Sequence, residues 1–202
     1  MYIPEHYKNT DPKEIRMFLK EHSFGILINT VDGKPWGTHI PLEFGVNATQ
    51  DEVLIGHIAK ANPQSKNIVD GDEVLCIFNG PHSYISSSWY QDEEVPTWNY
   101  IAVHIYGTIK IQTQTALEAS LHALVDKYEQ NSEHPISLHD MAPQTMRQVK
   151  GIIGFEIVIK DIQAVKKLSQ GRFHDHDKII DALEKRGAAE KAVATEMKKL
   201  RN

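Results

Sequence analysis

Three segments of the chain carry polar or aromatic side chains at positions where ordinary strand-forming residues would be enough to build a strand. The first is Thr38-His39-Ile40-Pro41-Leu42, a strand pattern in which the proline forfeits one ladder hydrogen bond. A proline in such a strand indicates a sheet edge, a bulge or a wall that faces a ligand. The residue types alone leave these three interpretations open.

The second segment, Gly56–Gln64, ends a strand in a helix-like turn that carries Lys60 and Asn62. Free backbone N–H groups at such a turn, together with a lysine, can hold a phosphate. A solvated connector accounts for the same residues equally well.

The third segment is rich in aromatic residues and runs from Gly80 to Tyr90 and from Val95 to Tyr100. Large aromatic side chains with a polar group can wall a planar ligand, form a subunit interface or pack in a core. The four that concern us are Trp89, Tyr90, Trp98 and Tyr100.

Motifs that define common enzyme classes are missing from the sequence. It has no Gly-x-Gly-x-x-Gly fingerprint, Walker loop, nucleophile elbow or spaced Cys/His zinc pattern, so we assign no catalytic residue. The cluster His174-Asp175-His176-Asp177 can bind a metal if it is extended, or can be a solvated loop that leads into a helix. Two ligands seldom make a metal site, so we assign no metal ligand.

The elements that must position these residues are mostly strands. An aspartate, a proline and a glutamate at 11–14 predict a helix over 11–22. Strand-forming residues then predict a hairpin over 23–31 and 36–44 around Asp32-Gly33. Further strands are expected at 52–58, 73–78, 83–87 and 98–111. Strands in close succession favour an antiparallel barrel or sandwich.

Helices are expected mainly in the second half of the chain. A capping box at Thr115 predicts a helix through about Gln130 that caps the barrel. A loop with a short helix near 144–149 and a strand over 151–159 follow, and from Asp161 the composition favours one or two helices divided at Gly187. We therefore expect one split-barrel domain over residues 1–160 and a helical extension over 161–202 that is not an independent domain.

Length and composition agree with one globular core. The 202 residues are 41% hydrophobic and 24% charged, with a net charge of −5 and a single cysteine, Cys76. No apolar run approaches the roughly 20 residues that cross a bilayer, and no leader is visible, so we expect a soluble, cytoplasmic protein without a membrane partner. Residues 164–202 carry 10 basic and 6 acidic side chains, a balance that permits DNA binding without indicating it.

The same segments carry a family resemblance that extends over essentially the whole chain. They are Met1–Pro4, His39–Leu42, Gly56–Pro63, Gly80–Ser86, Ser88–Tyr90, Val95–Tyr100, Lys150–Ile152 and Lys167–Gln170. In these residues the sequence closely resembles the PaiB-type FMN-binding negative transcriptional regulators. It departs from the family pattern at three positions, where Lys60 replaces Arg, Ser87 replaces Pro and Gly171 replaces Asn. Lys60 keeps the charge but loses the bidentate fork that suits phosphate, which weakens the expected flavin affinity.

The resemblance implies an FMN-binding split barrel, an antiparallel Greek-key β-barrel that pairs as a homodimer with flavin at the interface. By similarity to other split-barrel flavoproteins, one strand lies along the isoalloxazine ring, one turn holds the ribityl phosphate, and aromatic residues approach from the partner protomer. These three groups are Thr38, His39, Ile40, Pro41 and Leu42; His57, Ile58, Ala59, Lys60 and Asn62; and Trp89, Tyr90, Trp98 and Tyr100.

The function that the resemblance implies is repression of transcription, because related Bacillus-type proteins are described as repressing protease production and sporulation. We expect a flavin-binding regulator rather than an enzyme, and direct DNA binding stays open. The alternatives are a flavin-dependent oxidoreductase or a haem-handling protein, with His57, His82 or the 174/176 pair as candidate haem ligands. A protein-interaction module with an empty flavin site is a third interpretation.

Overall fold

The computed structural model describes residues 1–200 and divides the chain into two compact units. Unit 1 comprises Met1–Phe18, Phe78–His104 and the chain from Gln163 onward, and unit 2 comprises Leu19–Ile77 and Ile105–Ile162. The residues from 163 onward, which the sequence sets apart as an extension, thus fold together with an internal segment and the N-terminus.

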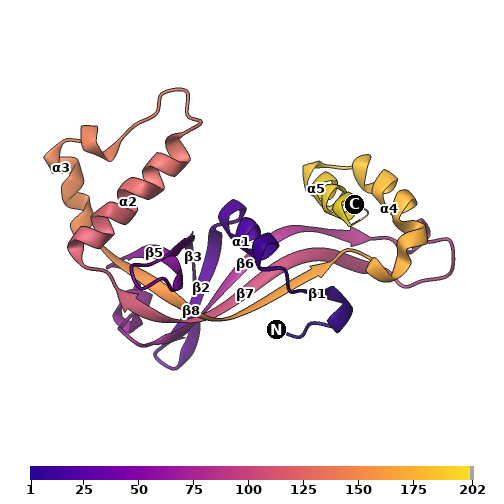
Figure 1. The fold of residues 1–202 in the computed structure, drawn as a ribbon, viewed down its shortest axis with the longest axis horizontal. Coiled ribbons are helices and arrows are strands. Elements are labelled where there is room, and N and C mark those ends of the chain that lie inside the picture. The colour runs from indigo at the N-terminus through magenta and orange to yellow at the C-terminus, as the bar shows by residue number, and fades with distance from the viewer. Residues whose placement is uncertain (201–202) are drawn as a thin grey trace. The chain divides into compact units, whose positions relative to one another are not determined.

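Strands dominate the architecture, as predicted, and every pairing of known register is antiparallel. Within residues 1–200 they are β1 (Lys8–Asn9), β2 (Phe24–Val31), β3 (Lys34–Pro41), β4 (Glu43–Val46), β5 (Glu52–Ala59), β6 (Glu73–Ile85), β7 (Thr97–Ile111) and β8 (Ile152–Lys167). Hydrogen-bonded neighbours follow the order β3-β2-β6-β7-β8-β5-β4, and β1 pairs with β8 (Figure 1).

The described helices are α1 (Pro12–Glu21), α2 (Gln114–Glu129), α3 (Pro143–Met146), α4 (His176–Glu184) and α5 (Ala188–Lys199). Short 3-10 turns are η1 (Glu5–Tyr7), η2 (Pro63–Asn67), η3 (Ser87–Trp89), η4 (Leu138–Asp140), η5 (Arg147–Gly151) and η6 (Gln170–Asp175). In this part of the chain no helix is long and apolar enough to cross a membrane.

The predicted hairpin is confirmed as β2 and β3. Asp32 and Gly33 both have positive φ angles, 49° and 75°, which is the conformation of the tight turn that matches strand twist. Pairing runs from Val31 opposite Lys34 to Phe24 opposite Pro41. This register decides which side chains of β3 face the interior of unit 2.

The core of unit 2 lies between its strands, where alternate side chains are fully buried. These include Leu27, Leu54, Cys76, Ile105, Phe155 and Ile157. Each aliphatic side chain so buried contributes about 1.5–3 kcal/mol of hydrophobic stabilisation. Helix α2 covers part of this unit through Leu117, which touches Gly154 of β8.

The start of α2 differs from the sequence prediction. The helix begins at Gln114, and the Thr113 hydroxyl accepts a 3.2 Å hydrogen bond from the backbone N–H of Ala116. The predicted cap at Thr115 is therefore wrong by two residues. Two threonines flank Gln114, and both satisfy the sequence preference for a cap.

Unit 1 contains the C-terminal helices packed on the ends of the long strands (Figure 1). Its core joins the buried residues Ile85, Tyr90, Ile101, Leu168, Ile179, Ile180, Leu183, Val193, Ala194 and Met197. The predicted division near Gly187 is confirmed, because α4 ends at Glu184 and α5 starts at Ala188.

One helix prediction and one division between predicted strands are wrong. Residues 161–167 extend β8 instead of starting a helix, because Val165 and Ala164 pair with Lys8 and Asn9 of β1. The strands predicted at 73–78 and 83–87 are one strand, β6. Its ladder with β2 covers Leu75–Ile77, so Pro81 lies beyond that ladder, where its missing N–H costs little.

Candidate functional site

Strand alternation separates the five predicted residues of β3 and its end into two groups. Thr38 lies opposite Leu27, and Ile40 and Leu42 are buried, so these side chains face the interior of unit 2. His39 lies opposite Ile26 and is exposed on the other face. The segment therefore cannot present all five side chains to one ligand.

The predicted turn after β5 is held firmly by backbone contacts. His57 and Ile58 pair with β8, and the backbone N–H of Lys60 donates a 2.8 Å hydrogen bond to the Gly151 carbonyl. The Lys60 ammonium donates to the Lys150 carbonyl at 2.7 Å. Both Ala59 and Lys60 are exposed, so the lysine is accessible to a ligand.

Asn62 closes this turn by capping η2. Its side-chain oxygen accepts a 3.0 Å hydrogen bond from the backbone N–H of Gln64, and Pro63 occupies the first helical position. The Asn62 amide also donates to the Thr38 hydroxyl at 3.0 Å. The structure thus brings together Thr38 and Asn62, which come from two separate predicted segments, whereas the Lys60 ammonium, two residues before Asn62, contacts the Lys150 carbonyl.

Sequence reasoning missed the residue that anchors this turn. Gln64 is fully buried, and its side-chain amide donates to the Leu27 carbonyl at 3.2 Å and to the Asn29 side chain at 3.0 Å. Because a buried amide must find partners, this glutamine fixes the turn against β2. The Asn62-Pro63 pair marks the start of a helical turn, but it does not indicate which residue of that turn is buried.

His57 borders a small cavity of about 250 Å³ in unit 2. The cavity lies between Pro41, Ile55 and His57 on one side and Ser120 and Leu124 of α2 on the other. Burial lowers the pKa of His57, so its imidazole is neutral near pH 7. A neutral imidazole at a cavity can accept a hydrogen bond or ligate a metal.

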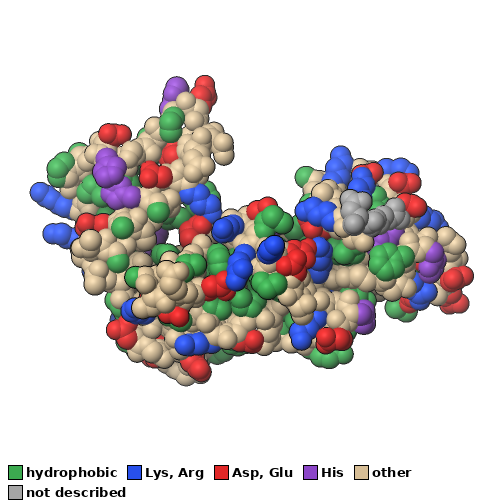
Figure 2. Space-filling view, in the orientation of Figure 1, with side chains coloured by type: hydrophobic (Ala, Val, Ile, Leu, Met, Phe, Trp, Pro, Cys, Tyr) green, Lys and Arg blue, Asp and Glu red, His purple; other side chains and the backbone are tan. Residues whose placement is uncertain are grey.

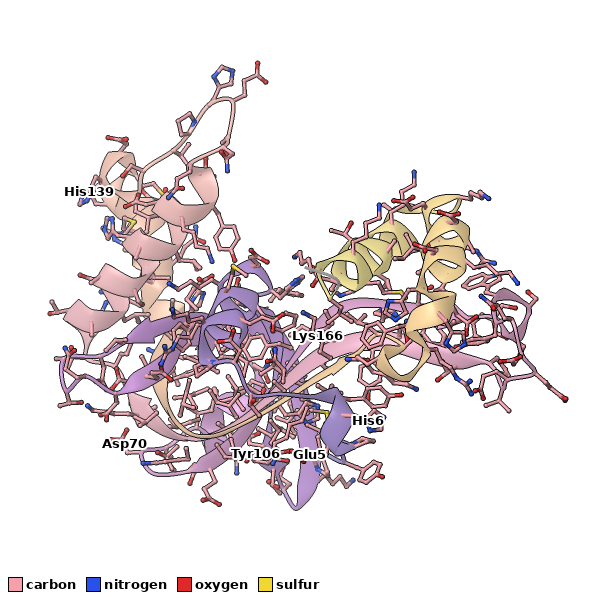
Figure 3. The ribbon with its side chains drawn as sticks, turned by 45° about the vertical axis from the view of Figure 1, so that its right-hand side comes forward. Glu5, His6, Asp70, Tyr106, His139 and Lys166 are labelled. Carbon is pink, nitrogen blue, oxygen red and sulfur yellow. The ribbon has the colours of Figure 1, made fainter. Side chains whose placement is uncertain are left out.

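The outer face of the β2–β6 pair is unusually apolar. Ile26 lies opposite Ile77 and Ile28 opposite Leu75, and all four are partly accessible, whereas the intervening Leu27 is buried. These residues, with Tyr106 of β7, form what we call the outer apolar face; Figure 3 labels Tyr106. A hollow of about 360 Å³ on this face is lined by Ile28, Leu75 and Tyr106.

The four predicted aromatic residues belong to unit 1, whereas the β3 and β5 residues belong to unit 2. Tyr90 is buried in the unit 1 core, and Trp89 packs against that core with the Arg186 guanidinium 4.7 Å from its ring. Trp98 is 53% exposed and Tyr100 is partly buried. Of the four, Trp98 therefore offers the most surface to another molecule.

The His174–Asp177 segment is helical rather than extended. His176 is fully buried and its Nε2 donates to the Ser169 carbonyl at 2.9 Å, while His174 Nε2 lies 3.1 Å from a carboxylate oxygen of Asp175. Asp175 also accepts a hydrogen bond from the backbone N–H of Gln91. Both histidines thus contact groups of the protein, and the described residues contain no cluster of three or more metal-ligating side chains.

Comparisons with known structures define the class of fold. The FAD and heme binding protein from Mycobacterium smegmatis has a TM-score of 0.62 at 14% identity, covering 80% of this chain and 73% of that one. The flavocytochrome Anf3 from Azotobacter vinelandii has a TM-score of 0.61 at 14% identity, covering 82% and 72%. The fold is mainly antiparallel β with flanking helices, and it is the split barrel that the resemblance implied.

Sequence comparisons then define the family. The family described as "Putative FMN-binding domain" matches residues 1–161. The "Protease synthase and sporulation protein PAI 2" of Bacillus subtilis is 43% identical over 187 residues, which cover 91% of this chain and 89% of that protein. The uncharacterized protein AN0679 of Emericella nidulans is 29% identical over 236 residues, covering 93% and 92%. The chain belongs to this FMN-binding family, and the predicted resemblance is confirmed.

Proposed function

We propose that this protein is an FMN-binding negative regulator of transcription that acts in the cytoplasm on protease production and sporulation. The observation that carries this proposal is the 43% identity over 91% of the chain to a Bacillus subtilis protease synthase and sporulation protein. Similarity over nearly the whole length supports a shared role more strongly than a shared fold does.

The turn after β5 supports the phosphate half of the flavin site. The Lys60 ammonium is exposed, and the Thr38 hydroxyl and Asn62 amide lie hydrogen-bonded beside that turn. A cation with hydroxyl and amide groups fits the phosphate monoester of FMN. We assign phosphate binding to Thr38, Lys60 and Asn62. We assign a supporting role to the end of β5, which consists of His57, Ile58 and Ala59.

The outer face of β3 supports the ring half of the site, because β3 is an edge strand and one FMN can pass around that edge from Thr38 on the inner face to His39 on the outer face. His39 is exposed there, and Phe24 lies beside it with the ring centroids 6.1 Å apart. A planar isoalloxazine ring suits a flat sheet face with an aromatic edge. FMN bound there supplies redox-active ring chemistry, and the role of His39 is to orient the ring. Ile40 and Leu42 support β3 from the core, and Pro41 contributes its backbone.

The outer apolar face supports a homodimer. Antiparallel sheets that face water on one side normally alternate apolar and polar residues, but β2 and β6 carry Ile26, Ile28, Leu75 and Ile77 outward. A second copy of the chain would remove this apolar surface from water. In such a dimer we propose that each protomer contributes Trp98, together with Trp89 and Tyr100, to the flavin site of its partner. Tyr90 does not take part, because it is buried in the unit 1 core.

Direct operator binding is not part of the proposal. Three basic residues of this region have intramolecular partners: Lys198 and Lys199 of α5 contact Glu184 and Glu196, and Arg186, between α4 and α5, lies over Trp89. Arg201 lies outside the described residues. Figure 2 shows acidic and basic side chains mixed over these helices on the visible face. A DNA-reading surface needs a more concentrated basic patch.

The test combines flavin retention, mass and transcription. Purified protein is saturated with FMN, freed of excess ligand and examined by absorbance and by size-exclusion mass. We expect about one FMN per protomer on a dimer, and derepression of a protease reporter when the gene is deleted. A protein that retains no FMN, or a reporter unaffected by deletion, contradicts the proposal. A salt-dependent gel-shift assay on the reporter promoter measures direct DNA binding separately.

Two alternative functions are a haem-handling protein and a flavin-dependent oxidoreductase. The environment of His57 favours the first of them. Its neutral imidazole is a suitable ligand type for haem iron. The same absorbance experiment after incubation with hemin separates the candidates. A Soret band that is lost in His57→Gln, or steady NAD(P)H oxidation by the FMN-loaded protein, would favour the alternative over the regulator.

A further inference from the structure

A second polar pocket lies entirely within unit 1 and is unrelated to the residues assigned to FMN phosphate. Its volume is about 210 Å³, and its lining includes Tyr7, Tyr90, Thr97, Lys167, Ser169 and Arg172. Segments that the sequence analysis singled out supply Tyr90, Thr97, Lys167 and Ser169, the turn η6 adds Arg172, and the N-terminal turn η1 adds Tyr7. Strand β1, directly after that turn, pairs with the end of β8, which leads into Lys167. Figure 3 labels His6, the neighbour of Tyr7.

Lys167 provides the positive charge of this pocket. Its ammonium donates to the Thr97 hydroxyl and lies 5.6 Å from the centroid of the Tyr7 ring. Within residues 1–200 these contacts are with uncharged groups, the Thr97 hydroxyl and the face of the Tyr7 ring. The charge of Lys167 is therefore not neutralised by an ion pair with a described residue.

Arg172 differs, because its guanidinium forms an ion pair with Glu94 at the pocket wall. The charged lining is thus Lys167 and Arg172 against Glu94, a net charge of +1. One uncompensated positive charge pairs with a single negative charge, whereas a dianion would bring a second negative charge into the pocket without a partner. The Arg172–Glu94 pair also fixes the wall that Lys167 faces.

The floor of the pocket is held in a strained conformation. Ser169 has a φ of 62°, which is uncommon for a residue other than glycine. Two buried side chains stabilise it: Asn99 exchanges hydrogen bonds of 3.0 and 3.1 Å with the Ser169 hydroxyl, and His176 binds its carbonyl. Strain of this kind often occurs at ligand sites.

Hydroxyl groups complete the lining. Burial raises the pKa of the Tyr90 phenol, while a hydrogen bond with Ser169 acts in the opposite direction. The phenol therefore stays protonated at neutral pH and can donate a hydrogen bond. Tyr7 and Thr97 add two further hydroxyls that can turn toward an acceptor.

We infer that this pocket binds a small organic monoanion through its carboxylate, with Lys167 as the charged partner and the Tyr90 hydroxyl as a donor. The volume is below the roughly 300 Å³ of drug-sized sites, so the ligand is small. The aromatic ring of Tyr7 and the side chain of Val95 offer contact to an apolar part of the ligand. This inference does not depend on FMN binding or on a regulatory role.

The experiment is run at pH 8.5 with benzoate as the probe, benzamide as its neutral isostere and inorganic phosphate as a dianion. Titration calorimetry on the full-length protein should give measurable binding of benzoate and at least tenfold weaker binding of benzamide and of phosphate. Equal affinities for benzoate and benzamide would overturn the role of charge. Tighter binding of phosphate would overturn the carboxylate assignment.

Two variants locate the binding. Lys167→Met should weaken benzoate binding at least tenfold, whereas Lys185→Met, an exposed lysine in the same unit, should leave it unchanged. Gly171→Leu fills the pocket without disturbing the fold, because a Cβ at Gly171 meets no atom within 4 Å. It should abolish benzoate binding with an unchanged melting temperature. Full benzoate affinity in Gly171→Leu would overturn the site even if Lys167→Met fails to fold.

FMN retention distinguishes this site from the flavin site. Both pocket variants should retain FMN as the unmodified protein does, since their residues lie outside the turn that contains Lys60. Loss of FMN from Gly171→Leu would assign the pocket to the flavin site and overturn its independence. Failure of all forms to bind FMN, with benzoate binding intact, would contradict the proposed function and leave this inference standing.

Discussion

The side-chain amide of Asn62 donates a 3.0 Å hydrogen bond to the hydroxyl of Thr38, which lies 24 residues earlier in the chain. The bond joins β3 to the turn that follows β5. Asn62 simultaneously caps η2 by accepting from the backbone N–H of Gln64. One residue therefore both shapes the turn and fixes it to the neighbouring strand.

A double-mutant cycle should detect this link. We expect Asn62→Ala to lower the free energy of unfolding by about 1–2 kcal/mol, because it removes a helix cap and a side-chain hydrogen bond. Thr38→Val should cost about 1 kcal/mol. The double variant should lose less than the sum, with a coupling of about 0.5–1.5 kcal/mol in urea unfolding. Strict additivity would show that the bond contributes nothing to stability.

The position of Lys60 predicts its effect on flavin affinity. Lys60→Glu should weaken FMN binding at least tenfold, or about 1.4 kcal/mol, because a carboxylate replaces the cation beside the phosphate. Lys60→Arg should strengthen binding, since its planar fork suits phosphate. Lys66→Glu, an exposed lysine in the same turn, is the matched control. Flavin fluorescence titration measures all three, and equal losses in Lys60→Glu and Lys66→Glu would remove Lys60 from the site.

Much of the fold could be predicted from local patterns. The Asp32-Gly33 turn needs positive φ angles, and only a few residue types adopt them, so the hairpin followed directly. The first helix, Pro12–Glu21, was equally clear from the sequence. Asp11 lies directly before it, and its carboxylate accepts a hydrogen bond from the backbone N–H of Lys13. In both cases the signal and the structure lie within a few residues of each other.

Predictions failed where tertiary contacts override composition. Residues 161–167 are rich enough in helix formers to suggest a helix, but pairing with β1 from the far end of the chain keeps them in β8. The site shows the same limit. Sequence analysis named Thr38 and Asn62 separately, yet neither their hydrogen bond nor the buried anchor Gln64 follows from local spacing.

Close packing at Gly107 predicts a strong effect of a single methyl group. A Cβ added there would lie 2.5 Å from the Val158 carbonyl oxygen and 2.7 Å from Ile157. Backbone atoms cannot give way, so Gly107→Ala should destabilise the protein by about 1–3 kcal/mol. Gly151→Ala is the matched control, because its Cβ meets nothing within 4 Å. Similar melting temperatures for the two variants would contradict this packing.

Burial of His57 predicts a pH-dependent stability. Burial lowers its pKa in the folded protein, whereas the unfolded chain keeps an ordinary value near 6.5. Below that pH the unfolded chain binds the proton more readily, so stability is fully present above about pH 7.5 and falls as the pH decreases through 6.5 toward the lower folded pKa. His104 acts in the same direction, because burial and the charged N-terminus lower its pKa.

Urea unfolding at pH 7.5 and pH 5.5 checks this dependence. The unmodified protein should have a lower midpoint at pH 5.5, and His57→Gln should reduce the difference between the two midpoints, because glutamine takes up no proton in this range. The double variant with His104→Gln should reduce it further. A difference that His57→Gln leaves unchanged would show that the imidazole is not desolvated in the folded state, and would also remove the neutral ligand on which the haem alternative depends.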